Sequence, residues 1–334
     1  MLILGIESSC DDTAAAVWEN RNTLLASVLS SQDAVHRPFG GVVPELASRR
    51  HLESVYPVVD EALKRAKVTL ADIDLVAATQ GPGLIGSLLV GFSFAKALAA
   101  VKSIPFRGVD HMAGHILSAF LEETAPSFPY IALIASGGTT SLYLAESHTS
   151  FVLLGRTRDD AAGEAFDKVA KLLDLPYPGG PQVARLAEEW HGELINFPRA
   201  WLEEESFDFS FSGLKTAVLN HCNHCRRSGV SLPVAQICAS FQEAVIEVLV
   251  EKTLRAARQR EVPTIVLGGG VSANSRLREV FAKRSRQAGK KLYVPRPAFS
   301  TDNAAMIALA GYYSFLKHGP SEMVSDVYSR SSLG

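Results

Sequence analysis

Two histidines four residues apart, His111 and His115, are the residues whose type and spacing first suggest chemistry. In a helix this spacing is a little over one turn, so both imidazoles would project from one face and reach a single metal ion. Most histidines make only ordinary hydrogen bonds, so a third ligand is needed. Asp302, at the predicted start of the last helix, is the natural candidate, although a carboxylate there also suits an N-cap. Two histidines and a carboxylate suit zinc or iron.

A triple glycine suggests a second kind of site. Gly268, Gly269 and Gly270 separate a predicted strand at 263–267 from a predicted helix that runs through residue 280. Glycine lets backbone N–H groups close around an anion, and a helix N-terminus adds partial positive charge. Asn274 could then bond a ribose hydroxyl or a base edge. The small polar turns at 8–11 and 136–138 also suit close approach of a phosphate. All three segments are equally compatible with ordinary tight turns.

Other polar clusters give weaker signals. The segment His221-Cys222-Asn223-His224-Cys225 holds one C-x-x-C without a partner pair, which is weak evidence for a metal site. The basic stretches 49–51, 283–286 and 290–291 permit RNA contact but do not predict it. The net charge of −2 gives no overall attraction to nucleic acid.

Composition sets the class of protein. The chain has 334 residues, 47% of them hydrophobic and 20% charged, which suits two domains with a large core. The N-terminus reaches acidic residues within its first dozen and lacks the features of a signal peptide. The apolar stretch 84–101 is expected to be a buried helix, not a membrane span. We therefore expect a cytoplasmic protein with no membrane association.

The pattern of predicted elements indicates a duplication. Strands are expected at 2–6, 14–18, 24–30 and 75–78, with helices at 44–65 and 84–101. The same order, strand–polar turn–strand and then strand–glycine loop–helix, returns with strands at 130–135, 141–145 and 263–267. Any α/β chain contains such units, but the matching order favours two similar halves with mixed sheets and a ligand cleft between them.

An insert at roughly 155–262 separates the repeats of the second half. Its phenylalanines alternate at 207, 209 and 211, which is typical of a strand. A long helix is expected at 233–258 and a last helix at 304–315. The polar tail after residue 319 is expected to be poorly ordered.

Several long motifs, spread from residue 5 to residue 310, closely resemble the TsaD family of tRNA threonylcarbamoyladenosine synthesis proteins, formerly described as O-sialoglycoprotein endopeptidases. The motifs that carry the resemblance are GIESSCDDT, FGGVVPELASR, QGPGLIGSLLVG, DHMAGH, SGGTT, DDAAGEAFDKVAKLL with YPGGP, DFSFSGLKTA, GGGVSAN and STDNAAMIA.

The resemblance implies an α/β, actin-like ATPase (ASKHA) fold with two duplicated ribonuclease-H-like lobes around a cleft. We expect residues 1–115 with 303–325 to form the N-terminal lobe. Residues 116–302 form the C-terminal lobe, with a helical insert near 155–262. The implied activity moves a threonylcarbamoyl group from threonylcarbamoyl-AMP to the N6 amine of the adenosine 3′ of the anticodon (position 37), in tRNAs that read codons beginning with A.

The resemblance also implies roles for individual residues and partners. One divalent metal is expected, iron in the first place and zinc as the alternative. TsaB-like and TsaE-like proteins are the implied partners, and a threonylcarbamoyl-AMP synthase supplies the substrate. The implied metal ligands are His111, His115 and Asp302; the implied acyl-adenylate site comprises Ile134, Ala135, Ser136, Gly137, Gly138, Asp167, Gly180 and Asn274; Asp11 and Asp12 are the acidic residues expected at the reacting end.

Two positions depart from the family pattern. Glutamate commonly follows the first aspartate, whereas this chain has Asp12, which is one methylene shorter. The second hairpin commonly carries histidine where this chain has Thr139, so an imidazole beside the metal and carbamoyl site is missing. Neither change touches the implied metal ligands or Asn274, so we expect a working site.

Three alternatives remain. A zinc protease of the H-E-x-x-H type needs a glutamate beside the first histidine, but Met112 stands there. A small-molecule kinase of the same superfamily would use Mg²⁺, which the histidine pair suits poorly. A non-catalytic or weakened scaffold subunit of the same complex is the third, and it is suggested by Asp12 and Thr139.

Overall fold

The computed structural model describes residues 1–334 except 21, 22, 202, 204, 332 and 334. The described chain forms two compact units. The first comprises residues 1–126, 145–152 and 295–334, and the second comprises residues 127–144 and 153–294.

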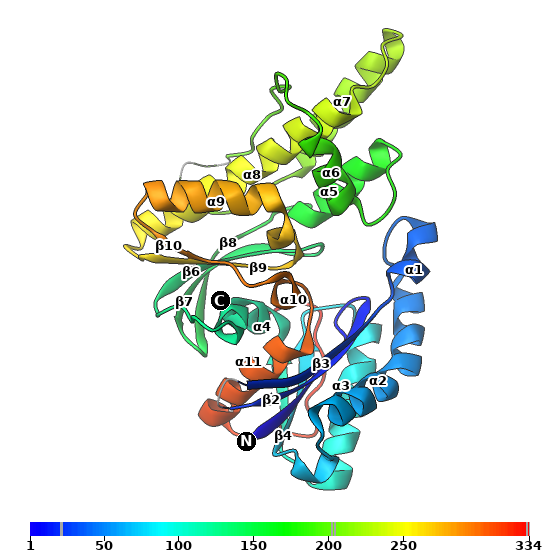
Figure 1. The fold of residues 1–334 in the computed structure, drawn as a ribbon, viewed down its shortest axis with the longest axis vertical. Helices are drawn as coiled ribbons and strands as arrows, with labels where there is room; N and C mark the ends of the chain where they lie inside the picture. The colour runs from blue at the N-terminus through cyan, green and yellow to red at the C-terminus, as the bar shows by residue number, and fades with distance from the viewer. Residues whose placement is uncertain (21–22, 202, 204, 332, 334) are drawn as a thin grey trace. The chain divides into compact units, whose positions relative to one another are not determined.

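The first unit is built on a five-stranded sheet in the order β3-β2-β1-β4-β5 (Figure 1). Strand β1 pairs antiparallel with β2 and parallel with β4, which in turn pairs parallel with β5. The strands are β1 (Leu2–Glu7), β2 (Asp12–Glu19), β3 (Thr23–Ser31), β4 (Leu75–Gly81) and β5 (Phe106–Asp110). The strands expected from the sequence are all present, and each is extended by one or a few residues.

Helices cover both faces of this sheet. On one face, α2 (Pro44–Ala66) and α3 (Ile85–Lys102) enclose an apolar core that includes Val17, Val59 and Phe92. On the other face lies α11 (Ala304–His318). Glycines allow this helix to approach closely, since a Cβ on Gly5 would lie 2.3 Å from the carbonyl oxygen of Ala304. The remaining helices of the unit are the short α1 (Asp33–His36), α4 (His111–Leu117) and α10 (Pro297–Ser300), with 3-10 turns at Arg37–Phe39, Leu70–Asp72 and Ser118–Leu121.

Helix α3 is the one helix in the described chain that is long and apolar enough to span a membrane by length and composition. Such a test is also passed by core helices of water-soluble domains. Leu88, Phe92 and Ala95 of α3 are buried within the unit, where the helix packs against α2 and β4. Only 33% of this apolar stretch is buried, so α3 is a helix with one buried face and not the fully buried helix expected from the sequence.

The second sheet has the order β10-β9-β6-β7-β8, which repeats the order of the first when read from the other edge. Strands β6 and β9 run parallel, as β1 and β4 do. The strands are β6 (Tyr130–Ala135), β7 (Thr140–Ser147), β8 (Ser150–Arg156), β9 (Thr264–Gly268) and β10 (Lys291–Tyr293). The common strand order confirms the duplication expected from the sequence. Strands β8 and β10 were not foreseen.

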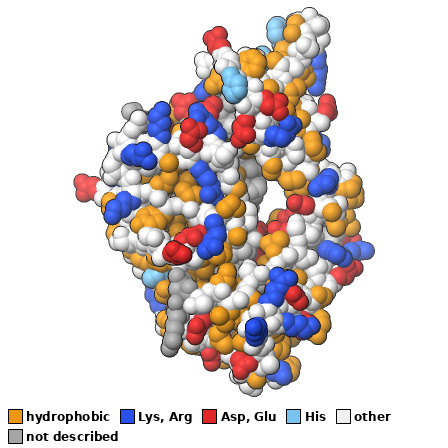
Figure 2. All heavy atoms as spheres, viewed as in Figure 1, with side chains coloured by type: hydrophobic (Ala, Val, Ile, Leu, Met, Phe, Trp, Pro, Cys, Tyr) orange, Lys and Arg blue, Asp and Glu red, His pale blue; other side chains and the backbone are white. Residues whose placement is uncertain are grey.

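The helices of the second unit are α5 (Ala162–Leu172), α6 (Gly179–Glu188), α7 (Ser212–Arg227), α8 (Val234–Gln259) and α9 (Ser275–Gln287), with a 3-10 turn at Gly270–Ala273. The long helix expected at 233–258 is therefore α8, which packs against β6, β9 and α6. Space-filling atoms show acidic and basic side chains interspersed over the visible face (Figure 2).

Two expectations need correction. All three of the alternating phenylalanines are buried. They were expected to form a strand, but Phe209 forms only an isolated bridge with Thr157. The carboxylate of Asp159 explains this, because it accepts the backbone N–H of Phe211 and takes it out of any ladder. The tail after residue 319 is also not loose. Its backbone binds the sheet, for example where the N–H of Tyr328 donates to the carbonyl of Gln80.

Candidate metal centre and nucleotide cavity

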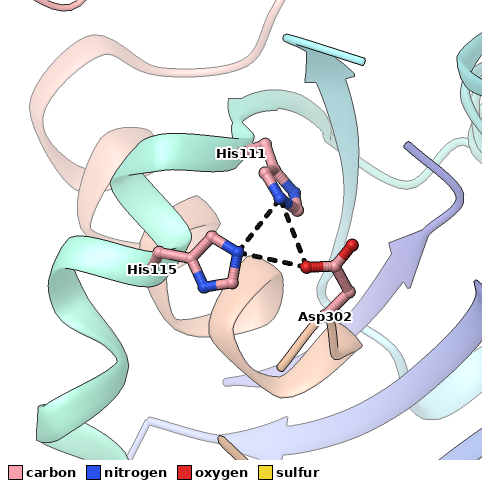
Figure 3. A group of neighbouring side chains, drawn as sticks. All are labelled: His111, His115 and Asp302. Carbon is pink, nitrogen blue, oxygen red and sulfur yellow. Dashed lines mark hydrogen bonds and ion pairs between the residues drawn. The ribbon is translucent and has the colours of Figure 1, made fainter. Parts of the chain in front are cut away.

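The three expected metal ligands converge within the first unit (Figure 3). His115 Nε2 lies 3.1 Å from Asp302 Oδ1 and 3.1 Å from His111 Nε2. His111 Nε2 lies 3.5 Å from the same carboxylate oxygen. No other group of three or more His, Cys, Asp or Glu residues in the described part of the chain meets the geometry of a metal site.

Local structure aims each of these side chains. The Asp110 side chain accepts the N–H of Met112 and so starts α4 immediately before His111. The helix then places His115 one turn further on, as the spacing predicts. Asp302 precedes α11, but the N-cap of that helix is Asn303, whose side chain accepts the N–H of Met306. The alternative capping role for Asp302 is therefore not used, and its carboxylate is available as a ligand.

The donor set fits a transition metal. With metal–nitrogen and metal–oxygen distances of about 2.0–2.1 Å, ligand atoms around a tetrahedral ion lie about 3.3 Å apart. The three separations here are 3.1, 3.1 and 3.5 Å. Imidazole nitrogen and carboxylate oxygen are ligands of zinc and of non-haem iron. Three protein ligands leave further positions for a substrate.

Glu7, which sequence reasoning did not select, belongs to the same cluster. It is fully buried, and its Oε2 lies 2.9 Å from His111 Nδ1 and accepts the hydroxyl of Thr79 at 2.7 Å. Such a carboxylate fixes the tautomer of a metal-binding imidazole so that Nε2 faces the ion. The signal in the sequence was a glutamate at the end of the apolar strand LILGIE, where a buried charge needs a partner.

The buried histidines and carboxylates of this cluster shift one another's pKa values. Burial by itself would lower the pKa of His111, but the carboxylates of Glu7 and Asp302 raise it well above its usual value. Burial lowers the pKa of His115. Burial would raise the pKa of Glu7 and of Asp302, yet His111 beside each holds both below their usual range. The carboxylates are therefore ionised at neutral pH and attract a cation.

Asp11 and Asp12 lie at the turn from β1 to β2 in the same unit. His51 of α2 fixes this turn, because its ring nitrogens bind the Cys10 carbonyl at 2.9 Å and the Thr13 hydroxyl at 2.8 Å. His51 is thus a buried structural residue, whatever role the adjacent arginines have. Burial and the neighbouring Asp11 raise the pKa of Asp12 to about 7, and burial also raises that of Asp11. Asp12 Oδ1 is buried with no hydrogen-bond partner among the described residues.

A cavity of about 380 Å³ lies within the second unit, a volume suited to a small ligand. The first turns of three helices line it, at Gly163 of α5, Gly180 of α6 and Ser275 of α9. Converging helix N-termini favour an anionic group such as a phosphate. The lining residues are Gly137, Gly163, Phe166, Asp167, Pro178, Gly180, Pro181, Ala184, Gly270, Val271, Ala273, Asn274 and Ser275.

Four of the expected adenylate-site residues line this cavity: Gly137, Asp167, Gly180 and Asn274. Asp167 also accepts the N–H of Gly179 at 2.8 Å and so holds the YPGGP loop. The side chain of Asn274 caps α9 through the N–H of Leu277 and donates to Gln242 Oε1. Its main observed role is therefore to shape the cavity.

The other four expected adenylate-site residues do not line the cavity. Ile134 and Ala135 are buried in β6. Ser136 and Gly138 belong to the turn that follows, in which the Ser136 carbonyl accepts the N–H of Gly163. This close contact requires glycine at 163, where a Cβ would lie 2.6 Å from that carbonyl oxygen. The turn therefore holds one lining residue of the cavity, Gly163, in place.

The His/Cys segment at 221–225 and Thr139 both have ordinary structural surroundings. Cys222 and Cys225 are buried on α7, and Cys225 Sγ contacts His221 Nε2 at 3.7 Å. These residues form no metal-type cluster within the described chain. Thr139 is half-buried in the hairpin turn, where its N–H donates to the hydroxyl of Ser136.

The two like-ordered sheets and their helices define the actin-like ATPase fold. Among solved structures, HypF of T. kodakarensis matches with a TM-score of 0.65 at 15% identity, over 95% of this chain and 48% of that chain. At this identity the match concerns the fold alone.

Sequence comparison gives the family. The family model for TsaD, tRNA N6-adenosine threonylcarbamoyltransferase, matches residues 23–309. A protein of that name from Desulfotalea psychrophila is 60% identical over 100% of this chain and 98% of its own length. Another from Syntrophus aciditrophicus is 53% identical over 97% of this chain and 95% of its own. The chain belongs to the TsaD family and is a transferase that modifies tRNA. The protease, kinase and scaffold alternatives are not favoured.

Proposed function

We propose that the chain transfers the threonylcarbamoyl group from threonylcarbamoyl-AMP to the N6 amine of the adenosine 3′ of the anticodon in tRNA. The observation that carries this proposal is the presence, in one TsaD-family chain, of a His–His–Asp cluster and a cavity lined by helix N-termini. The His–His–Asp cluster suits a metal ion that polarises a carbonyl or phosphoryl oxygen. The cavity suits the phosphate of an adenylate.

The adenylate is assigned to the cavity of the second unit. The N–H groups of Gly163, Gly179 and Leu277 already have acceptors within the protein. The phosphate of the adenylate is therefore assigned to other backbone N–H groups in the first turns of α6 and α9, such as those of Gly180 and Ser275, which line the cavity. Phe166 and Val271 supply apolar surface for a base or ribose. A Cβ added to Gly137 or to Gly180 would have no neighbouring atom within 4 Å, so both glycines leave open space for the ligand.

His111, His115 and Asp302 are assigned to one divalent metal, iron or zinc. Such an ion, when bound, acts as a Lewis acid that polarises a carbonyl or phosphoryl oxygen. Glu7 keeps His111 in the tautomer that presents Nε2, and the ionised carboxylates offset the positive charge. The residues thus provide a prearranged binding site.

The chemical step is a nucleophilic acyl transfer. The N6 amine attacks the carbamoyl carbon, the bond from that carbon to the phosphate oxygen breaks, and AMP leaves with the electron pair. The amine must lose a proton. Asp12, whose pKa lies at about 7, is assigned as the acceptor, because a group that titrates near the working pH accepts and releases protons efficiently. Asp11 is assigned to the same end of the site, where it helps raise the pKa of Asp12.

Partners follow from the family resemblance. A groove of about 590 Å³ between α2 and α3 is lined by apolar residues and Ser93, and Leu52 and Tyr56 there are 67% and 65% exposed. Exposed apolar surface of this kind is typical of a protein interface, and we assign it to a TsaB-like partner. A TsaE-like protein and a threonylcarbamoyl-AMP synthase complete the pathway, in the cytoplasm. Leu52→Asp should abolish co-elution with the TsaB-like partner, and unchanged co-elution would contradict the assignment.

The transfer itself is tested with purified components. The metal-loaded chain and its partners are mixed with threonylcarbamoyl-AMP and unmodified tRNA, and the nucleosides are analysed by mass spectrometry. Modified adenosine and stoichiometric AMP are expected. A folded, metal-loaded chain that yields neither would contradict the proposal.

A further inference from the structure

The C-terminal segment, residues 319–331, lies along β5, the edge strand of the first sheet, from the start of β5 to the ends of β4 and β5. The N–H of Ser321 donates to the Phe106 carbonyl at 2.8 Å, and the Gly108 N–H donates to the Ser321 hydroxyl at 3.0 Å. Further along, Gln80 Nε2 donates to the Asp326 carbonyl at 2.6 Å. Contacts at both strands fix the path of the segment.

Tyr328 is the residue at which this segment packs most tightly. A Cβ on Gly81 would lie 2.1 Å from the Tyr328 carbonyl oxygen and 2.4 Å from its ring. Gly81 is the last residue of β4, and in the strand pairing it stands opposite Asp110. The absence of a side chain at position 81 therefore makes the space in which the tyrosine ring lies beside the end of β5.

The Tyr328 hydroxyl reaches the residue that starts the metal-binding helix. It donates to Asp110 Oδ2 at 2.9 Å, and the Ser331 hydroxyl donates to the same oxygen at 2.8 Å. The other oxygen, Oδ1, accepts the N–H of Met112 and caps α4. One carboxylate thus joins the C-terminal segment to the first turn of α4.

This junction bears on metal-ligand geometry because α4 is short. The helix has seven residues and opens with His111, so its orientation depends strongly on its N-cap. The chain that leaves Asp302 runs through α11 into the C-terminal segment and returns to Asp110 through Tyr328. The C-terminal segment therefore connects Asp302, through the chain, to the N-cap of the helix that carries His111 and His115.

We infer that Tyr328, assisted by Ser331, is a positioning residue for the metal site: it holds Asp110, which fixes the start of α4 and so the positions of the His111 and His115 Nε2 atoms. The inference rests on the proposed metal-binding function of His111, His115 and Asp302. Tyr328 touches neither metal nor substrate in this account. Its effect is on the geometry and strength of metal binding.

The test measures Zn²⁺ affinity of the full chain by competition with a chromophoric chelator, and records the visible spectrum with saturating Co²⁺. Tyr328→Phe keeps the ring beside Gly81 and removes only the hydroxyl. We expect its Zn²⁺ affinity to fall about tenfold, as for other residues that orient metal ligands, and its Co²⁺ bands to shift. Ser331→Ala should change both readouts in the same direction, and it tests the same carboxylate if Tyr328→Phe fails to fold. Tyr293→Phe, at a tyrosine of β10 in the second unit, is the matched control and should leave both readouts unchanged.

The outcomes separate this inference from the metal assignment. Asp302→Ala should lose Zn²⁺ binding in the same assay. If it does, while Tyr328→Phe and Ser331→Ala keep the parent affinity and Co²⁺ spectrum, the positioning role is overturned and the metal site stands. If the parent chain takes up no Zn²⁺, or Asp302→Ala binds it equally well, the metal assignment and the positioning role are both overturned.

Discussion

Glu7 Oε2 lies 2.9 Å from His111 Nδ1, although the two residues are 104 positions apart in the chain. The buried carboxylate comes from the end of β1, and the histidine opens α4. The contact turns the opposite ring nitrogen toward Asp302. A strand of the first sheet thereby sets the orientation of a ligand on the short, largely buried helix α4.

Replacing Glu7 should weaken the metal site without removing a ligand. In Glu7→Gln the side chain loses its charge, and its single amide oxygen can replace only one carboxylate oxygen. Either Oε2, which contacts Thr79 and His111, or Oε1, which accepts the N–H of Ser9, is then lost as an acceptor. We expect Zn²⁺ affinity to fall about 10- to 100-fold, measured by chelator competition. Glu53→Gln, at an exposed position of α2, is the control. Equal affinities in the folded Glu7→Gln variant and the parent would show that Glu7 has no part in ligand orientation.

Filling the nucleotide cavity should block binding but preserve the fold. Gly180 is the second residue of α6, lines the cavity and has open space where a Cβ would be. Gly180→Leu should therefore change the free energy of unfolding by no more than about 0.5 kcal/mol and reduce AMP affinity at least about tenfold, measured by calorimetry. Gly213→Leu is closely matched, because Gly213 is the second residue of α7, has equally open surroundings and does not line this cavity. AMP binding to Gly180→Leu at the parent affinity would place the nucleotide elsewhere.

The raised pKa of Asp12 predicts a pH-dependent cost to stability. Its pKa is about 7 in the folded chain, against 3.8 for an ordinary aspartate, because burial and Asp11 disfavour the charged form. The folded chain therefore binds more protons than the unfolded chain between about pH 4 and 7, and stability falls as the pH rises through this window.

Asp12→Asn removes this cost. Its stability relative to the parent should rise between pH 4 and 8, by about 4 kcal/mol at most, since one pKa unit corresponds to about 1.4 kcal/mol. Chemical denaturation at several pH values measures the difference. Glu123→Gln, at an exposed position, controls for the loss of a negative charge. A stability difference that does not vary with pH would contradict the shifted pKa.

The sequence predicted that His111, His115 and Asp302 would lie together, but not the residues around them. The spacing of His111 and His115 anticipated a shared helix face, because a helix has a fixed period. The sequence did not indicate a role for Glu7, because it ends an apolar strand and its partner, His111, lies far along the chain on another element. Tyr328 and Ser331 were missed for a related reason. A polar C-terminal segment has the composition of a disordered one, and its ordered path depends on the space beside Gly81, which only the tertiary structure shows.

The duplication was visible in the sequence because both halves repeat the same order of strands and glycine turns. Strand β10 was missed since it has only three residues, too few for a recognisable alternation. Four residues of the expected adenylate site, Gly137, Asp167, Gly180 and Asn274, line one cavity. Motif letters could not show that Ile134 and Ala135 support the turn from within β6, because burial depends on the tertiary packing.

The most direct test of the account is made on Asp302→Ala, with Asp60→Ala on the exposed face of α2 as control. Both variants and the parent are assayed for bound metal and for transfer of threonylcarbamoyl from threonylcarbamoyl-AMP to unmodified tRNA, with partner proteins present. We predict that Asp302→Ala remains folded, loses its metal and loses transfer, whereas Asp60→Ala keeps both. An Asp302→Ala variant that retains both its metal and its transfer activity would contradict the account.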